Sequence, residues 1–405
     1  MTAIQTAPLA DVAEVVRGVT FSKSEAADKP AEGFVPVLRA GNIQDRLILD
    51  EDLVFVPRDR VHSKQMIRKG DIVICTSSGS AEVVGKTAYA NMDWNGSFGA
   101  FCAGIRVKSA NADPSYVFHF LRSPHFRSWT QKSSGANIKN IRKSELDQFE
   151  IPLPPVSEQK RIASILDKAD EIRRKRVRFG EETQDFVRSA YLHAVGHLNP
   201  SHGDWQPFTI DALAEDRRGA IRSGPFGSAL RHDEFVDEGI AVLGIDNAVQ
   251  NMFAWAERRF ITPSKYEELR RYKVFPGDVI ITIMGTTGRS AVVPDDIPEA
   301  ITTKHLATIT CNKELIHPEV LSFAIHSDPL IIRQIKSFNK GAIMDGLNLG
   351  IIRQLEINLP PMEEQLRFVR MLRKARAIET RSQTSDGSGE DLFQSLSQRA
   401  FRGEL

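Results

Sequence analysis

The sequence predicts an α+β protein made of two similar halves, each a mixed α/β body followed by a long helix. The chain has 405 residues, which at roughly 100–200 residues per domain corresponds to two or three domains. One segment recurs at an offset of half the chain, which indicates two copies of one unit. Each copy runs into a stretch where apolar residues follow a helical period with few breaks.

The repeat is clearest around a Leu-Pro-Pro sequence near the end of each half. Residues 134–162, SGANIKNIRKSELDQFEIPLPPVSEQKRI, match residues 340–368, KGAIMDGLNLGIIRQLEINLPPMEEQLRF. The identities fall at one offset of 206 without a gap: Gln148 on Gln354, Glu150 on Glu356, Leu153 to Pro155 on Leu359 to Pro361, and Glu158 and Gln159 on Glu364 and Gln365. So many identities at one offset are hard to attribute to chance.

The bodies repeat with more divergence. A Gly-Asp pair precedes an apolar β-rich run at Gly70-Asp71 and again at Gly277-Asp278, which is typical of a turn into a buried strand. The apolar spacing of 114–127 and 318–336 predicts helices. The two bodies therefore share a scaffold and differ in what they contact.

A long helix is expected after each Leu-Pro-Pro. Pro154 and Pro155 do not fit a helix interior, Ser157 is a good N-cap, and the apolar positions that follow have a period near 3.5. The second copy is interrupted at 385–389. An isolated amphipathic helix cannot bury its own stripe, so we expect the two helices to pack on each other or on partner subunits. The alternative is that each helix folds onto its own body.

These patterns divide the chain into four parts. We define a first body (1–155), a central long helix (156–200), a second body (201–361) and a distal long helix (362–405).

The charge balance excludes a histone-like basic protein and an acidic tail. The chain has 53 basic and 52 acidic side chains, a net charge of +1. Residues 1–200 carry 28 basic and 24 acidic groups, and residues 201–405 carry 25 and 28. A basic surface on one face remains compatible with these totals. Neither half is basic enough to hold DNA by charge alone.

Cysteine usage and the N-terminus predict a reducing compartment. Cys75, Cys102 and Cys311 are odd in number and far apart, which excludes a disulfide scaffold and a CxxC zinc knuckle. The N-terminus does not resemble a signal peptide, and no run approaches 18 apolar residues. We expect a cytoplasmic protein.

Enzyme signatures are missing. Residues 77–87 resemble a phosphate-binding loop, but five residues separate Gly79 from Gly85 and no helix-forming sequence follows. His193 and His197 are better read as a frayed helix end than as a metal site. Asn358 does not begin the Asn-Pro-Pro-aromatic motif of an amino-methyltransferase. We therefore expect no catalytic residue, no metal site and no stand-alone enzyme.

Basic residues gather in groups beside small polar residues at turns. This combination suits phosphate anchoring and reading of base edges, although each group could equally be an ordinary solvated surface. The groups are Arg122 to Lys143, Arg173 to Arg178 and Arg258 to Lys273.

Taken together, these residues resemble the specificity subunit of type I restriction–modification enzymes. The resemblance spans essentially the whole chain and rests on the duplicated Leu-Pro-Pro-x-x-Glu-Gln junctions, the helices after them, and four further motifs: Ser223 to Ser228, Gly277 to Ile281, Gly285 to Arg289 and the closing Ala400 to Leu405. In the first body Thr76 to Ser80 replaces the Gly-x-x-Gly turn, and 385–389 interrupts the second helix.

The resemblance implies a bacterial or archaeal protein with two target-recognition domains, each reading one half of a split, asymmetric DNA sequence. The long helices would form an antiparallel coiled-coil spacer, making the chain a pseudo-twofold repeat. They would dock two methyltransferase subunits and, through them, the restriction subunits. This chain would bind no cofactor itself. The complex would use S-adenosylmethionine, and ATP with Mg²⁺ for restriction.

Candidate contact residues follow from these expectations. For DNA we select polar and basic loop residues: Arg39, Asn42, Ser77, Ser78, Ser80, Lys132, Ser134, Asn137 and Lys139 in the first body, and Arg222, Ser223, Asn247, Thr286, Thr287, Arg289, Lys304, His305, Asn339 and Lys340 in the second. For partner binding we select apolar helix positions: Ile162, Ile165, Ile172, Phe179, Phe186, Phe368, Met371, Ile378, Leu392 and Leu396.

Two other hypotheses remain open. One is a divergent DNA methyltransferase or NTPase acting alone. The other is a non-catalytic helical scaffold that never touches DNA.

Overall fold

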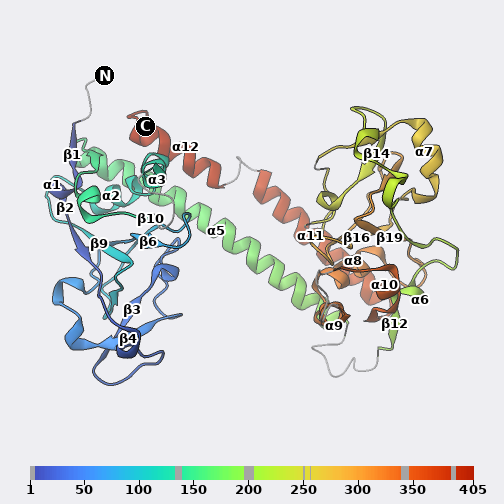
Figure 1. The fold of residues 1–405 in the computed structure, drawn as a ribbon, viewed down its shortest axis with the longest axis horizontal. Coiled ribbons are helices and arrows are strands. Elements are labelled where there is room, and N and C mark those ends of the chain that lie inside the picture. The colour runs from blue at the N-terminus through green and yellow to red at the C-terminus, as the bar shows by residue number, and fades with distance from the viewer. Residues whose placement is uncertain are drawn as a thin grey trace. The chain divides into compact units, whose positions relative to one another are not determined.

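The computed structural model describes residues 5–132, 139–195, 205–249, 251–255, 257–338, 346–384 and 389–405. The chain forms two compact units (Figure 1). The first unit comprises residues 1–178 and 382–405, and the second comprises 179–381. Each unit contains one body, and the division between them falls inside a helix.

The first body is built around a four-stranded antiparallel sheet. Its order is β2 (Ala13–Arg17), β9 (Cys102–Val107), β5 (Ile72–Cys75) and β7 (Thr87–Tyr89). A second sheet has the order β4 (Val54–Pro57), β3 (Phe34–Leu38) and β8 (Ser97–Phe98), with β3 and β8 parallel. Two short antiparallel pairs complete it, β1 (Thr6–Pro8) with β11 (Glu150–Pro152) and β6 (Ser77–Ser78) with β10 (Lys139–Asn140).

The second body repeats this arrangement. The four-stranded order is β13 (Ile221–Ser223), β19 (Leu306–Ile309), β16 (Val279–Thr282) and β17 (Ser290–Val292). The three-stranded order is β15 (Phe260–Ile261), β14 (Ile240–Leu243) and β18 (Ala300–Thr302), again with one parallel pair, and β12 (Pro207–Thr209) pairs with β20 (Glu356–Asn358). The matching strand orders confirm the internal repeat expected from the sequence.

Short helices occupy corresponding places in both bodies, except α7, which has no α-helical counterpart in the first. They are α1 (Leu9–Val12), α2 (Pro114–Phe120), α3 (Pro124–Lys132) and α4 (Lys143–Asp147) in the first, and α6 (Ile210–Leu213), α7 (Pro263–Leu269), α8 (Pro318–Ser327), α9 (Pro329–Phe338) and α10 (Leu349–Gln354) in the second. The helices expected over 114–127 and 318–336 are confirmed. Each is split into two because Pro124 and Pro329 begin a new helix.

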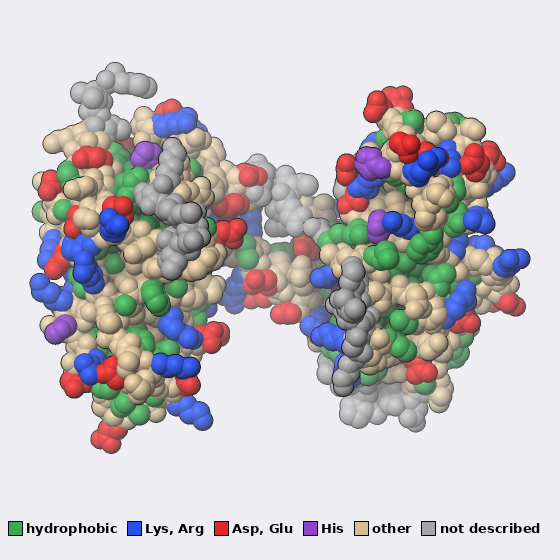
Figure 2. Space-filling view, viewed as in Figure 1, with side chains coloured by type: hydrophobic (Ala, Val, Ile, Leu, Met, Phe, Trp, Pro, Cys, Tyr) green, Lys and Arg blue, Asp and Glu red, His purple; other side chains and the backbone are tan. Residues whose placement is uncertain are grey.

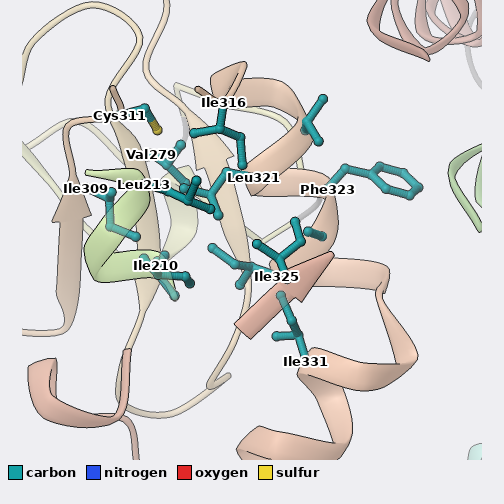
Figure 3. Close-up of a cluster of buried hydrophobic side chains, with 14 of the residues drawn as sticks. Ile210, Leu213, Val279, Ile309, Cys311, Ile316, Leu321, Phe323, Ile325 and Ile331 are labelled. Atoms are coloured by element: carbon teal, nitrogen blue, oxygen red, sulfur yellow. The ribbon is translucent and has the colours of Figure 1, made fainter. Parts of the chain in front are cut away.

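The Gly-Asp strands lie in the cores, as predicted. All residues of β5 and β16 are buried, and the preceding Gly70 and Gly277 have φ of 91° and 81°, a region that favours glycine. Figure 3 shows the core of the second unit, where Val279 and Ile309 from the sheet face Leu321 and Ile325 of α8.

The central long helix is α5 (Val156–Ala194), whose 39 residues correspond to about 58 Å. Ile162, Leu166 and Ala169, in its first half, are buried in the core of the first body. Val187 and Tyr191, in its second half, are buried in the core of the second unit.

The distal segment forms α11 (Met362–Thr384) and α12 (Gly389–Phe401). The predicted interruption at 385–389 lies mostly outside the described residues. Phe368 and Leu372 of α11 are buried in the second unit, whereas Phe393 and Ala400 of α12 are buried in the first.

Within the first unit, α12 runs antiparallel to α5. Near the start of α5, Arg161 donates to the Leu405 carbonyl (2.7 Å). Arg173, twelve residues later in α5, lies 3.4 Å from the carboxylate of Glu390, which precedes Leu405 in the chain. The described α+β architecture and the long helix confirm the expected fold class. Apolar residues in the stripes of the long helices are also buried against the bodies. Each unit combines a body, the first stretch of its own helix and the last stretch of the other half's helix.

The duplicated glutamine of the junction fastens each long helix to its body. The Gln159 amide oxygen accepts from the Asp113 backbone N–H (2.9 Å), and its amide nitrogen donates to the carbonyls of Asn111 and Pro154 (2.8 Å each). Gln365 makes the same three bonds, to His317, Leu315 and Pro360. Both side chains are buried. The Leu-Pro-Pro-x-x-Glu-Gln pattern therefore specifies the joint between helix and body.

Candidate nucleic-acid interface

The candidate residues that the structure brings together lie where β5 and β16 end. The Thr76 N–H donates to the Phe101 carbonyl and the Ile283 N–H donates to the His305 carbonyl, both at 2.9 Å. On the other side, the Ile141 N–H donates to Thr76 (2.8 Å), as the Leu347 N–H does to Ile283 (3.0 Å). Each strand end is thus held between a tight turn and the segment before α4 or α10. We call this region the strand-end surface: residues 76–80, 99–101 and 139–142 in the first body, and 283–289, 303–305 and 346–347 in the second.

The tight turn is built identically in both bodies. It spans residues 99–102 in the first and 303–306 in the second, closed by backbone bonds of 2.8 and 3.1 Å between its ends. Gly18 and Gly224 pass directly beside it, and a Cβ there would lie 2.0 Å from the Gly99 oxygen and 2.2 Å from the Thr303 oxygen. This close approach explains the glycine in the Ser-Gly-Pro-Phe-Gly-Ser motif of the second body.

Several predicted DNA contacts lie on the strand-end surface of the first body. Ser77 and Ser78 form β6 and are half-buried, and Ser80 is exposed just beyond them. The backbone of Lys139 pairs with Ser78 across β10. The first body thus presents small hydroxyl side chains at the end of its central strand.

The corresponding surface of the second body holds Thr286, Thr287, Arg289, Lys304 and His305. The Thr282 hydroxyl donates to the Thr286 carbonyl, and the Arg289 N–H donates to the Thr282 hydroxyl oxygen (2.9 Å). Gly285 and Gly288, with φ of 78° and 83°, allow this turn. The Gly-Thr-Thr-Gly-Arg motif is therefore a fixed turn that presents a threonine and an arginine.

Two histidines near this turn are biased toward the neutral form. Burial, helped by the charge of Arg289, lowers the pKa of His326 to about 4, and its Nε2 lies 3.4 Å from the Arg289 guanidinium. Burial, with the charge of Lys304, also lowers the pKa of His305. Neutral imidazoles can both donate and accept hydrogen bonds, as base edges require.

Three predicted contact residues have their polar groups used inside the bodies. Asn42 and Asn247 are buried and cap equivalent 3-10 turns, and their amides also bind the carbonyls of Glu51 (2.8 Å) and Ala254 (2.7 Å). The Arg222 guanidinium is 10% exposed and bonds to Asp278 (2.5 Å) and to the Lys273 carbonyl. The structure gives these residues an architectural place, because their donors and acceptors are already satisfied.

The remaining predicted residues are less informative. Arg39 is exposed and donates to the Asp52 carbonyl (3.0 Å), and Ser223 is half-buried on β13. Ser134, Asn137, Asn339 and Lys340 lie outside the described residues, as do the side chains of Lys132 and Lys139.

A groove of about 500 Å³ borders the strand-end surface of the first body. Its lining includes Arg17, Thr76, Asn140 and Arg142. Arg17 and Arg142 are exposed, and their guanidiniums donate no hydrogen bond and form no ion pair among the described residues. Neither was selected as a DNA contact from the sequence, although Arg142 belongs to the basic group Arg122 to Lys143. Arg17 occupies the place of Ser223, because each pairs with the second residue of the strand beside it, Ala103 or Ala307.

Positive and negative side chains are interleaved on the visible faces of both bodies (Figure 2). This agrees with the near-balanced composition. The groove of the first body is therefore distinguished by two guanidiniums without an ion-pair partner among the described residues, those of Arg17 and Arg142, and not by an excess of basic side chains.

The helix positions proposed for partner binding differ in exposure. Ile172, Phe179, Phe186 and Ile378 are 42–57% exposed, and Val177 is a further exposed apolar residue on α5. Ile165, Met371, Leu392 and Leu396 are half-buried, and Ile162 and Phe368 are buried in the bodies. The last two have no surface left for a partner.

The segment that resembles a phosphate-binding loop does not have the structure of one. Lys86 is followed by strand β7, not by the helix that a phosphate-binding loop needs. The described residues contain no group of three or more potential metal ligands. None of the described helices is long and apolar enough to cross a membrane.

Comparison with known proteins agrees with this architecture. The family model described as the type I restriction modification DNA specificity domain matches residues 1–176 and again 204–385. The EcoKI specificity subunit of Escherichia coli is 29% identical over 98% of this chain and 88% of its own. The StySPI specificity subunit of Salmonella potsdam is 30% identical over 99% of this chain and 89% of its own.

Solved structures share the fold. The S subunit of a type I restriction–modification system from M. genitalium matches with a TM-score of 0.63 at 16% identity, covering 99% of this chain and 97% of that one. A chain from a study of assembly and conformational transition of the type I R-M system matches with a TM-score of 0.51 at 17% identity, covering 99% and 98%. The chain therefore belongs to the DNA specificity subunits of type I restriction–modification systems, a family of non-catalytic proteins.

Proposed function

We propose that this chain reads a bipartite, asymmetric DNA target, with the strand-end surface of each body contacting one half-site. The proposal rests on one observation: the strand-end surfaces of the two bodies have the same backbone arrangement but carry different side chains. The turn, the strand end and the close-approach glycine are the same in both bodies. At matching positions one body carries Phe101 and Arg17 where the other carries His305 and Ser223. Equal frames with unequal side chains suit two different half-sites.

We further propose that two methyltransferase subunits dock on the long helices and bring restriction subunits with them. Ile172, Val177, Phe179 and Phe186 leave large apolar surfaces exposed along α5. Clustered exposed apolar groups on a soluble protein mark interaction sites. An internal repeat also offers two similar surfaces to two copies of one partner.

The cofactors of the reaction are assigned to those partners. We propose that the complex uses S-adenosylmethionine for methylation, and ATP with Mg²⁺ for restriction, and works in the cytoplasm. The net charges of the halves, +4 and −3 from the counts above, also suggest that partner subunits supply much of the non-specific hold on DNA.

Mapping of methylated positions tests the proposal. The chain is expressed with its methyltransferase in a host that lacks other modification, and all modified sites in the genome are aligned. We expect two short specified sequences separated by a spacer of constant length and free sequence. A single continuous target, or no shared sequence, would refute the bipartite reading.

Two binding measurements separate the other hypotheses. Footprinting of the reconstituted complex should give two protected regions, and an absence of sequence preference would favour a scaffold that does not read DNA. Calorimetry of the isolated chain should detect no binding of S-adenosylmethionine or ATP. Tight binding of either would favour an enzyme that acts alone.

A further inference from the structure

Phe101 is the most exposed large apolar side chain among the described residues, at 67%. It is the third residue of the tight turn formed by residues 99–102, between Ala100 and Cys102. No ring contact or cation–π contact within the described chain involves it, and it belongs to none of the buried clusters. The ring is therefore not part of the hydrophobic cores that the described residues form.

The backbone that carries this ring is held firmly. The Phe101 carbonyl accepts from the Thr76 N–H (2.9 Å), the Ser77 N–H (3.1 Å) and the Thr76 hydroxyl (3.1 Å). The Gly99 N–H, at the start of the turn, donates to the Leu38 carbonyl (2.9 Å). An exposed side chain on a fixed backbone is pre-organised for a partner, because binding orders only the side chain.

Polar groups suited to DNA surround this position. Ser77 and Ser78 follow the strand end to which Phe101 is bonded. Ala100, Cys102 and Thr76 line the groove that contains the free guanidiniums of Arg17 and Arg142. An apolar ring beside unpaired cations and hydroxyls matches the mixture of phosphate anchors and base contacts at protein–DNA interfaces.

The second body places a histidine on the same frame. His305 is the third residue of its own turn, and its carbonyl accepts from Ile283 as that of Phe101 does from Thr76. His305 is half-buried beside the exposed Lys304. The backbone of the two turns is therefore the same, but the side chains differ in chemistry. The phenyl ring of Phe101 makes only apolar contacts, whereas the imidazole of His305 can donate or accept a hydrogen bond.

We propose that Phe101 is a specificity-determining residue whose ring packs against a base of the first half-site, and that His305 is its polar counterpart for the second. A phenyl ring has no hydrogen-bonding group, so it selects an apolar feature: the thymine methyl group in the major groove, or the face of a base at a distorted step. This inference rests on the proposed function, because it names which side chain performs part of the reading.

The test uses the chain assembled with its methyltransferase on the mapped target. Phe101→Ala and Phe101→Trp are compared with the unmodified protein on the target and on every single-base-pair variant of both half-sites, with the methylation rate as the measurement. For Phe101→Ala we expect a loss of roughly tenfold on the target, and lost discrimination at one or two adjacent base pairs of one half-site only. Phe101→Trp should retain most of that discrimination.

Three controls accompany the measurement. Met92→Ala removes another apolar side chain of the first body, 56% exposed, and should change nothing. His305→Ala should alter preference in the other half-site. Arg17→Ala should lower the slope of binding against salt concentration by about one, which Phe101→Ala should leave unchanged. Replacing the contacted thymine by uracil distinguishes the two modes of contact: equal loss indicates the methyl group, and no loss indicates the base face.

The outcomes separate this inference from the proposed function. If Phe101→Ala keeps the original preference at every base pair, or weakens all sequences equally while its melting temperature is unchanged, the inference is wrong and the bipartite reading stands. If the unmodified complex itself has no sequence preference, the proposed function fails first.

Discussion

Replacing Gln159 by alanine should loosen the joint between the first body and α5. The side chain is fully buried and makes three hydrogen bonds, to Asp113, Asn111 and Pro154. Its removal leaves the Asp113 N–H and the carbonyls of Asn111 and Pro154, which are part-buried, without these partners. At roughly 1–3 kcal/mol for an unsatisfied buried group, and with partial relaxation, we expect a loss of about 2–4 kcal/mol in the unfolding free energy of the first unit.

Two measurements check this loss. Urea denaturation gives the free energy of unfolding, and hydrogen exchange should show earlier exchange of the Asp113 amide, which loses its acceptor. Gln148→Ala is the matched control, because that glutamine is also repeated in the second half but is exposed. Gln159→Glu should not rescue stability at neutral pH, since a carboxylate would face two carbonyl oxygens. A change below about 0.5 kcal/mol for Gln159→Ala would refute the reasoning.

Three further predictions concern the second unit. Arg222→Met leaves Asp278 buried without its cation, so we expect a loss of about 3–5 kcal/mol in unfolding free energy; unchanged stability would return Arg222 to the candidate DNA contacts. Gly224→Ala places a Cβ 2.2 Å from the Thr303 oxygen, so methylation assays on half-site variants should reveal lost reading of one half-site while reading of the other persists. His326 has a pKa near 4 in the folded chain and about 6.5 when unfolded. The unfolded state therefore binds the proton more readily, and stability should fall as pH drops from about 6.5 to 4; His326→Leu should lose that part of the pH dependence in denaturation curves.

The elements that the sequence predicts well are those specified locally. The Gly-Asp pairs place a positive-φ glycine before an apolar run, and both strands are buried where expected. The long helix α5 follows from periodicity and the absence of internal proline, but it begins at Val156, so the expected N-cap at Ser157 is wrong. Because the two halves repeat, an element predicted in one half is also expected at the matching position of the other.

Partner choice among polar groups is harder to predict, because it depends on residues distant in the chain. Asn247 and Arg222 have the composition of DNA contacts, yet their bonds to Ala254 and Asp278 are made inside the body. Phe101 is not among the residues selected from the sequence, and a phenylalanine beside a buried strand is more typical of a core than of a DNA contact. Aligning the two turns by their hydrogen bonds, 204 residues apart rather than 206, is what reveals it opposite His305.

The apolar stripe of the long helices is a related case. The period of the apolar residues indicates that one face of each helix must be buried. It does not indicate which part of the protein buries that face. Val187 and Tyr191 are covered by the second body, and Phe393 by the first.

The place of α12 also fixes the order in which the chain can finish folding during synthesis. The second unit ends at Arg381, so all of its segments have been made before α12 is complete. The first unit needs α12, because Phe401 packs against Tyr116 and Phe120 with ring centroids 5.5 and 5.0 Å apart. The body that leaves the ribosome first is therefore the last to close its core. Removal of α12 would leave the second unit's segments whole and take Phe393 and Phe401 away from the core of the first unit.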